Sequence, residues 1–428
     1  MNIPAIEAAL NGLAMFTAVK DSPLMRAFVE LLSSVDGKNG EKDCARGVCA
    51  WAEFVREFVD NGQPSWAKSV YRFARLDDNA FTRFVERFGR SARLLETVAE
   101  MDFSRLSEIA AFDVCALGFY IAESARGETP QAAARIETEA RALWNVEGTF
   151  GSGAPVQNPF AVPEAFAAFE RDVYAGGAGV LTFSTTFRWE GRLVPALSPD
   201  PVRLSDLFGY EDQRRAVIAN TKRFLEGKPA NNILLYGDRG AGKSTTVKAV
   251  CNEYVDKGLR LVELGKDNLN RLPVLMKELS CRGPRFVIFI DDLSFETVDD
   301  TFTCFKSLLD GGVEKRPENT VVYAATNRRH FIRERFSDGP RAFDAEQEQL
   351  SLSDRFGLTI VFTAPDQELF IHIAVAIAQQ RGVVFDETGR RKFRENALLW
   401  EKWFNGRSPR AAVQYVDWVM GGGDFPWE

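Results

Sequence analysis

The chain has 428 residues, 45% of them hydrophobic, so it is long enough for two or three domains with buried cores. Its formal net charge of −7 is uneven, because residues 1–200 contain 20 lysines and arginines against 27 aspartates and glutamates. The remaining residues carry equal numbers of each sign, and this distribution argues against general nucleic-acid binding, which depends on basic surface.

The numbers and spacing of cysteine and histidine residues argue against several kinds of functional site. The six cysteines contain no C-x-x-C pair, which argues against zinc sites and disulfide frameworks. The only histidines are His330 and His372, which argues against catalytic triads and metal sites built on imidazole. Phosphate chemistry is then the main candidate for the function of the chain. No apolar run approaches the ~20 residues needed to cross a bilayer. Because no signal-peptide pattern is present either, we expect a cytoplasmic protein without a membrane partner.

Residues 1–147 are predicted to form an all-helical N-terminal domain. Apolar residues recur at three- and four-residue spacing in four segments: Ala50–Val59, Ser65–Arg75, Ala80–Phe88 and Arg90–Met101. Phenylalanines dominate two of these stripes, with Phe54 and Phe58 in one and Phe81, Phe84 and Phe88 in the other. The stripes indicate a helix-to-helix core, and a groove for a partner peptide is the alternative.

One basic stripe interrupts the acidic charge of this domain. Four arginines at three- and four-residue spacing span the helix-breaking Gly89: Arg83, Arg87, Arg90 and Arg93. Glu86 and Glu96 lie close enough in sequence to neutralise part of the stripe. We therefore expect the domain to recognise a protein. Packing against the rest of the chain and nucleic-acid binding are the alternatives.

Residues 148–203 are predicted to connect this domain to the next. Gly148–Pro163 is rich in Gly, Ser, Pro and Asn and indicates a linker. A helix is expected at Ala165–Tyr174, followed by a β-hairpin with strands at Val180–Phe187 and Arg192–Leu197.

Residues 204–363 alternate strands with helices, which predicts a parallel sheet covered on both faces. Five strands are expected: Asn232–Tyr236, Leu259–Leu264, Arg285–Ile290, Thr320–Ala325 and Leu358–Phe362. After Pro365 the pattern is helical to Met420, so residues 364–428 form a smaller helical unit.

Residues 233–244 join an apolar strand to the phosphate-binding pattern G-x-x-x-x-G-K-S and a helix start. Three glycines let the backbone turn so that successive N–H groups face phosphates: Gly237, Gly240 and Gly242. Lys243 adds a positive charge for the β- and γ-phosphates, and Ser244 provides a hydroxyl for Mg²⁺. The helix from Thr245 directs its positive end at the anion, so the motif predicts nucleotide binding.

Polar side chains follow the next strands at the edge where ligands bind in open α/β sheets. After Phe286–Ile290, Asp291 can hold the Mg²⁺ shell, and Asp292 can orient or deprotonate the attacking water. Asn327 follows the next predicted strand, where its amide can hydrogen-bond the water and the γ-phosphate.

Two arginines complete the candidate site. Arg355 precedes the last predicted strand. Ser408 and Pro409 are expected to cap and begin a helix, so Arg410 lies in its first turn and can point toward the phosphates.

Taken together and in this order, the segments resemble the AAA+ ATPases. Tyr236–Ser244 resembles the Walker A segment and Phe286–Asp292 the Walker B segment. By resemblance, Asn327 falls at sensor 1, Arg355 at the arginine-finger position and Arg410 at sensor 2. Leu207–Glu211 resembles the stretch that contacts adenine, which implies roles for Phe208 and Gly209. The implied phosphate-binding set is Gly237, Asp238, Arg239, Gly240, Ala241, Gly242, Lys243, Ser244 and Thr245.

Four segments look like the bacterial ATPases labelled domain of unknown function 815: Asn231–Gly240, Asp291–Glu296, Ala325–His330 and Leu350–Gly357. This likeness covers roughly residues 165–420 and places residues 1–147 as a variable helical front. It implies an α/β P-loop NTPase sheet of the AAA+ type with a C-terminal helical lid. ATP and Mg²⁺ are the implied cofactors, and a homo-oligomer with Arg355 acting in trans is the implied assembly.

One departure from the commonest AAA+ pattern concerns the catalytic base. Most members end the Walker B strand in Asp-Glu, whereas this chain has Asp291-Asp292. Because Asp292 is one methylene shorter than glutamate, Glu296 is kept as the alternative base. The resulting hypothesis is an ATPase that remodels or switches a protein partner. The alternative is a slow nucleotide-gated scaffold or helicase-loader-like protein with little turnover.

Overall fold

The computed structural model describes residues 2–35, 44–145, 158–162, 164–293, 316–327 and 354–423. The chain divides into an N-terminal unit, Met1–Phe183, and a C-terminal unit, Ser184–Glu428. Among the described helices, none is long and apolar enough to cross a membrane.

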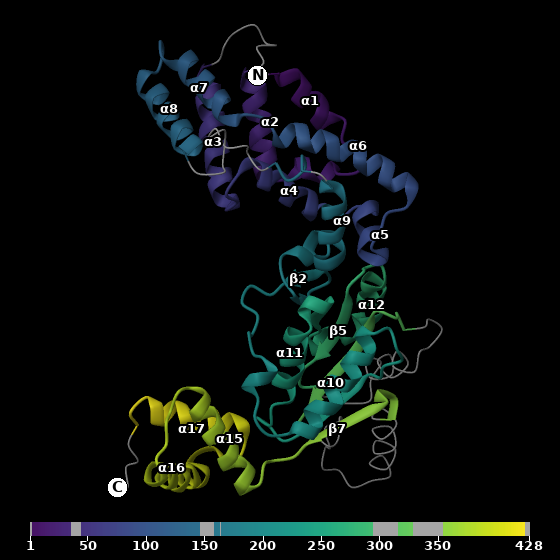
Figure 1. Cartoon of the computed structure of the whole chain (residues 1–428), viewed down its shortest axis with the longest axis vertical. Helices are drawn as coiled ribbons and strands as arrows, with labels where there is room; N and C mark the ends of the chain where they lie inside the picture. Colours follow the sequence, from purple (N-terminus) through teal and green to yellow (C-terminus); the bar gives the residue numbers. More distant parts are fainter. Residues whose placement is uncertain are drawn as a thin grey trace. The chain divides into compact units, whose positions relative to one another are not determined.

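The described elements of the N-terminal unit are all helical (Figure 1). They are α1 (Ile3–Asn11), η1 (Thr17–Asp21), α2 (Pro23–Val35), α3 (Cys44–Asn61), α4 (Trp66–Leu76), α5 (Ala80–Phe88), α6 (Arg93–Ala110), α7 (Val114–Ala125), α8 (Pro130–Asn145), α9 (Ala165–Gly176) and η2 (Gly179–Thr182). Because α9 packs against α5, the helix expected between the domains lies within this unit.

Aromatic side chains fill the core of the N-terminal unit. Phe28 packs on Trp66 with ring centroids 4.5 Å apart, and Phe54 lies in the same cluster. Phe81 is also fully buried, so core packing accounts for most of the two predicted phenylalanine stripes. The last member, Phe88, is instead 55% exposed.

A single buried carboxylate fastens the loop after α1 to α6. Asp102, fully buried on α6, accepts hydrogen bonds from the backbone N–H groups of Ala14 at 2.8 Å, Met15 at 2.6 Å and Phe16 at 3.1 Å. Arg105 donates to the other carboxylate oxygen at 2.8 Å. The charge is therefore compensated where it is buried, as burial requires.

Two predicted element boundaries in this unit are wrong. The helix expected from Arg90 begins at Arg93, because Ser91 is held by the carboxylate of Glu170 and Ala92 is extended. The strand expected from Val180 begins only at Thr186, where pairing with Leu261 starts, so it belongs to the C-terminal unit. Gly179–Thr182 forms a short 3₁₀ helix, closed by a hydrogen bond from the Thr182 hydroxyl to the Gly179 carbonyl.

The C-terminal unit is built on a sheet whose seven described strands follow the order β2-β1-β4-β5-β6-β3-β7. The strands are β1 (Thr186–Trp189), β2 (Leu193–Pro195), β3 (Ile233–Gly237), β4 (Leu259–Glu263), β5 (Arg285–Ile290), β6 (Thr320–Thr326) and β7 (Leu358–Phe362). Of these described strands only β2 pairs antiparallel, and it does so with β1. The strand order changes direction around β3, so its carboxyl end is the switch point where α/β sheets bind ligands.

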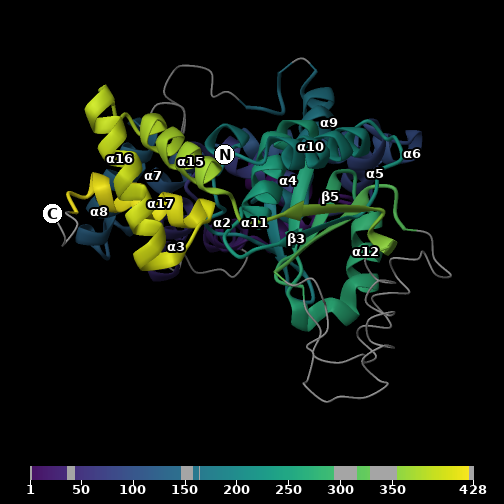
Figure 2. The ribbon, with the colours of Figure 1, turned by 90° about the horizontal axis from the view of Figure 1, so that it is seen from below.

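The C-terminal unit also contains helices and short helical turns, some on the faces of the sheet and others after its last strand. They are η3 (Leu204–Asp206), α10 (Glu211–Leu225), α11 (Lys243–Glu253), η4 (Val255–Lys257), η5 (Lys266–Arg271), α12 (Leu272–Ser280), η6 (Asp354–Phe356), α15 (Gln367–Gln380), α16 (Glu387–Trp400), the π-helical turn η7 (Glu401–Asn405) and α17 (Pro409–Met420). Right-handed crossovers put α11 and α12 on opposite faces (Figure 2).

Helices α15–α17 follow the sheet and share its apolar core. Phe370, Ile373 and Tyr415 belong to the same buried cluster as the strand residues Ile233 and Val321. The parallel sheet, the C-terminal helices and the helical N-terminal region confirm the predicted fold class, a P-loop sheet of the AAA+ type.

We predict that Asp102→Ala strongly destabilises the N-terminal unit, because three backbone N–H groups and Arg105 lose their acceptor. The expected loss is about 3 kcal/mol, or a melting temperature lower by roughly 10 °C in calorimetry of the full chain. Glu100→Ala is the matched control, since Glu100 is an exposed carboxylate on the same helix. Equal effects of the two substitutions would contradict the anchoring role of Asp102.

Candidate nucleotide-binding site

The glycine-rich loop between β3 and α11 depends on a close backbone approach. Gly237 has φ +142°, and a Cβ atom there would lie 1.9 Å from the carbonyl oxygen of Phe362. The next residue, Asp238, donates its N–H to that same carbonyl at 3.0 Å. Only glycine fits this position, where the loop leaves the sheet beside the end of β7.

The Lys243 ammonium group is buried at the centre of the site. The residue is 5% exposed, and its Nζ donates to the carbonyls of Gly237 at 2.9 Å and Asp238 at 2.8 Å and to Asn327 Oδ1 at 2.8 Å. Burial lowers the pKa of Lys243, against the opposing fields of the nearby aspartates, of which Asp291 acts most strongly. The arrangement holds a positive charge at the N-terminus of α11, which suits a phosphate.

Ser244 and Asp291 place two side-chain oxygens next to each other. The Ser244 hydroxyl donates to Asp291 Oδ1 at 2.7 Å. The described residues contain no group of three or more His, Cys, Asp and Glu side chains that could hold a metal alone. Two adjacent hard oxygens fit Mg²⁺, which takes its other ligands from water and substrate phosphates.

Asp292 is held beside this pair in a strained backbone conformation. Its φ is +51°, unusual for a residue other than glycine and a cost of about 1 kcal/mol. Asn327 Nδ2 donates to Asp292 Oδ1 at 3.0 Å, and the Leu293 N–H donates to the Ala325 carbonyl at 2.8 Å. The turn after β5 is thus fastened to the end of β6, and the two carboxylates are directed into one site.

The C-terminal helices contact the loop through the start of α17. Ser408 caps α17 by accepting from the Ala411 N–H at 3.0 Å, and Pro409 occupies the first helical position, as predicted. The Arg410 N–H donates to the Gly240 carbonyl at 3.3 Å, and a Cβ atom at Gly240 would lie 3.0 Å from Ser408 Oγ. The positive end of a second helix therefore faces the phosphate loop.

These groups line a cavity of about 670 Å³ within the C-terminal unit. One end is polar and holds the loop, the two aspartates, Asn327 and Arg410. The rest of the lining, called the apolar end below, contains Leu207, Phe208, Tyr210, Ile373, Ile377 and Val413, together with the charged residues Asp206 and Arg214. A polar end for phosphates joined to an apolar end for a flat ring suits a nucleotide.

Most of the sequence-predicted residues lie together on the wall of this cavity: Phe208, Arg239, Gly240, Ala241, Gly242, Lys243, Ser244, Thr245, Asp291, Asp292, Asn327 and Arg410. Gly237 acts through its carbonyl on Lys243. The Asp238 carboxylate points elsewhere and accepts from the Ala364 N–H at 2.6 Å. Gly209 has φ +74° and packs closely against Leu369 and Ile373 of α15.

Two predicted residues lie apart from this arrangement. Arg355 is half-buried in η6 and does not line the cavity. Glu296, the alternative base, lies outside the described residues. The apolar residues Ile373, Ile377 and Val413 were not predicted, because their helical spacing is equally typical of ordinary core.

Comparison with sequence families assigns most of the C-terminal unit to one family. The family described as "Protein of unknown function (DUF815)" matches residues 182–423, which is more than half of the chain. The chain belongs to this DUF815 family. The match begins close to the start of β1 and includes every described residue of the candidate site.

More distant similarities are partial. The DUF815 chain is 29% identical over 103 residues to the replication factor C large subunit of Staphylothermus marinus, covering 22% of this chain and 23% of that protein. The chain thus spans less than a quarter of that relative's length. Solved structures of RuvB from Thermotoga maritima are also similar. One RuvB variant has 16% identity and a TM-score of 0.36, covering 52% of this chain and 67% of RuvB. The RuvB Holliday junction branch migration motor has 16% identity, a TM-score of 0.35 and the same coverage.

We predict that Lys243→Ala strongly weakens Mg·ATP binding, because it removes the buried positive charge at the start of α11. Loss of about 3 kcal/mol corresponds to a roughly hundredfold weaker affinity in isothermal titration. Lys248→Ala is the control, since Lys248 lies on the same helix but outside the cavity. Unchanged affinity of the Lys243 variant would exclude this loop as the binding site.

Proposed function

We propose that the chain binds and hydrolyses ATP with Mg²⁺ as an oligomeric AAA+ ATPase. The observation that carries the proposal is the continuous set of hydrogen bonds at the mouth of the loop. It runs from Ser244 to Asp291 and from Lys243 through Asn327 to Asp292, at the N-terminus of α11. The charge of each group suits a role in phosphoryl transfer to water, which supports the proposal.

In this proposal the phosphate end of the cavity stabilises negative charge. Lys243 and the N–H groups of Gly240–Ser244 bind the β- and γ-phosphates, and Arg410 adds positive charge from α17. Ser244 and Asp291 hold Mg²⁺, which neutralises charge on the phosphate oxygens. Asp292 accepts a proton from the attacking water, and Asn327 orients Asp292 and the water.

The apolar end is proposed to bind the adenine ring. Phe208 supplies an aromatic face, and Ile373 and Ile377 of α15 supply an aliphatic wall. The Tyr210 hydroxyl donates to the Thr363 carbonyl at 2.7 Å, which holds this wall beside the sheet. Because the wall belongs partly to α15 and α17, nucleotide binding would draw these helices toward the sheet.

Arg355 is proposed to act in trans on the nucleotide of a neighbouring subunit. Its position outside the cavity of its own chain supports this role. An arginine supplied by a neighbour makes hydrolysis depend on assembly. The assembly would then remodel or switch a protein partner that is recognised through residues 1–147.

A slow nucleotide-gated scaffold or helicase-loader-like protein is the second candidate. Asp292 is shorter than the glutamate found in most AAA+ ATPases, and its carboxylate is occupied by Asn327. Both features favour low turnover. A scaffold should hydrolyse no faster when concentrated, whereas a remodelling ATPase should.

We predict that Asp292→Asn keeps ATP binding and lowers turnover by about 10²–10³-fold, because it removes a proton acceptor and leaves the phosphate contacts intact. Titration and a steady-state phosphate-release assay would measure the two effects. Glu296→Gln is the paired variant and should retain turnover. The opposite result would move the role of base to Glu296.

We predict that Arg355→Ala lowers turnover about a thousandfold while sparing nucleotide affinity. Arg355→Lys should recover little, since lysine lacks the planar guanidinium fork. Mixing Arg355→Ala subunits with Lys243→Ala subunits should restore some activity, because each supplies what the other lacks at shared interfaces. Activity per subunit that is independent of protein concentration, with monomers in ATP by light scattering, would rule out the trans role.

A further inference from the structure

A basic and aromatic surface lies where α5 passes into α6 in the N-terminal unit. Arg87, Phe88, Arg90, Arg93 and Leu94 are all exposed within eight residues of chain. Phe88 is 55% exposed and Leu94 is 76% exposed. Together with Tyr174 of α9, which is 57% exposed, these residues are called the arginine–aromatic surface below.

The backbone fixes these side chains close together. Helix α5 ends at Gly89, whose φ is +70° and whose N–H donates to the Val85 carbonyl at 2.8 Å. A Cβ atom at Gly89 would lie 3.4 Å from the Tyr174 ring, so the turn touches α9. The Ser91 hydroxyl donates to Glu170 of α9 at 2.6 Å. The turn is therefore held against α9 with its arginines directed outward.

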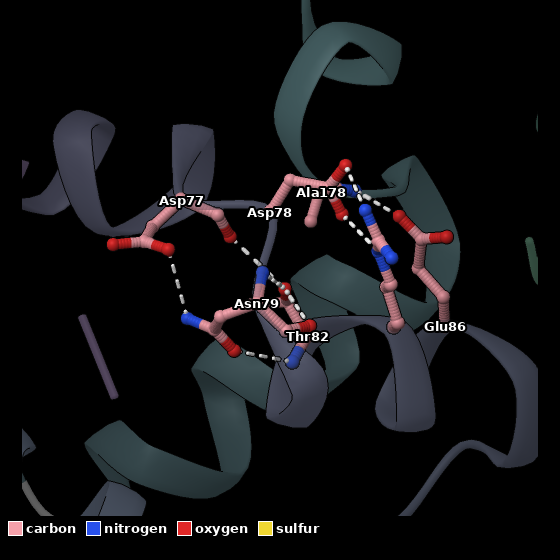
Figure 3. A network of polar contacts seen from close by, with 7 residues as sticks. Asp77, Asp78, Asn79, Thr82, Glu86 and Ala178 are labelled. Atoms are coloured by element: carbon pink, nitrogen blue, oxygen red, sulfur yellow. Dashed lines mark hydrogen bonds and ion pairs between the residues drawn. The ribbon is translucent and has the colours of Figure 1, made fainter. Parts of the chain in front are cut away.

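Two acidic side chains near this surface, Asp78 and Glu86, make their contacts inside the unit. Asp78 pairs with Arg83 at 2.8 Å and 3.1 Å, which removes Arg83 from the predicted basic stripe. Glu86 is 1% exposed and accepts from the Ala178 N–H, as Figure 3 shows. The prediction that Glu86 neutralises the stripe is therefore wrong, because its carboxylate points inward to the segment after α9.

Three arginines remain on the surface without a carboxylate partner among the described residues, and the Arg87 guanidinium lies over the Phe88 ring, 5.4 Å from its centroid. In the part of the chain that the structure describes, no ion pair joins Arg87, Arg90 or Arg93 to a carboxylate. Each of these arginines alone would be an ordinary solvated residue, and Arg87 also suits the last turn of α5. Their grouping with exposed aromatic and aliphatic side chains, in a region that is acidic overall, is what distinguishes the surface.

We propose that the arginine–aromatic surface docks an acidic segment of a partner protein that also carries aromatic or aliphatic side chains. Guanidinium groups bind carboxylates in bidentate pairs, and Phe88, Leu94 and Tyr174 can bury apolar side chains between them. This inference rests on the proposed function, in which residues 1–147 recognise a partner protein, and it adds that the recognised segment is acidic and partly apolar.

Charge complementarity favours a short acidic segment over a nucleic acid. A polyanion would continue past the three arginines across the N-terminal unit, where residues 1–183 contain 18 basic against 25 acidic residues. Its phosphate backbone would also leave Leu94 without an apolar contact. A short acidic peptide can place its carboxylates beside the arginines only, and its apolar side chains can contact the apolar side chains between them.

The test uses the full chain and a short fluorescein-labelled peptide of alternating Asp, Leu, Glu and Phe, followed by fluorescence polarisation. Arg90→Ala/Arg93→Ala should weaken binding about tenfold, and Phe88→Ala should also weaken it. Arg26→Ala/Lys68→Ala is the matched control, because it removes two exposed cations outside the surface and should leave the affinity unchanged. Binding should weaken as salt concentration rises.

Three results would overturn the inference: no binding of the peptide, equal loss in the control and test variants, or preferential binding of labelled single-stranded DNA that depends on Arg90 and Arg93. Mg·ATP titration of the same proteins separates this inference from the proposed function. Nucleotide affinity should be unchanged in the surface variants, and peptide binding should persist in Lys243→Ala. If the chain binds the peptide with the expected variant pattern but does not bind ATP, the docking inference would stand and the proposed ATPase function would be contradicted.

Discussion

The burial of one ammonium group constrains the whole candidate site. A buried cation must meet oxygen atoms on all sides, since leaving it unpaired costs several kcal/mol. Lys243 meets this requirement with two carbonyls of its own loop and the side-chain oxygen of Asn327 at the end of β6. The cation thus joins the loop after β3 to the neighbouring strand. Asn327 also donates a hydrogen bond to Asp292, so the position of the Lys243 ammonium group influences the position of the Asp292 carboxylate.

The N-terminal unit depends on a buried charge of the opposite sign. Its core is built from contacts between rings such as Phe28, Phe54 and Trp66, and such apolar contacts are not directional. Asp102 is more restrictive, since its carboxylate is satisfied only where three successive N–H groups of the loop after α1 converge. Apolar burial provides stability, and the buried carboxylate fixes which loop conformation accompanies it.

Local sequence patterns predicted the strands and the phosphate loop, because an apolar run and a glycine pattern act over a few residues. All five predicted parallel strands are present, and Arg285–Ile290 and Leu358–Phe362 have the predicted ends. Local patterns do not predict contacts between residues that are distant in sequence. Three features depend on tertiary packing. They are the apolar side chains of α15 in the cavity, the hydrogen bond that the Ala364 N–H donates to the Asp238 carboxylate, and the inward direction of Glu86. The false strand start at Val180 has the same origin, because β1 begins only where β4 can pair with it.

The link between β7 and α15 has a consequence for motion. Phe362 is bound by the Asp238 N–H, Thr363 by the Tyr210 hydroxyl and Ala364 by the Asp238 carboxylate. Three consecutive residues are therefore fastened to the phosphate loop and to the segment before α10. Any swing of α15–α17 relative to the sheet must pivot beyond Ala364, close to Pro365. Because both Asp238 bonds end just before that pivot, a displacement of the loop would move the pivot itself.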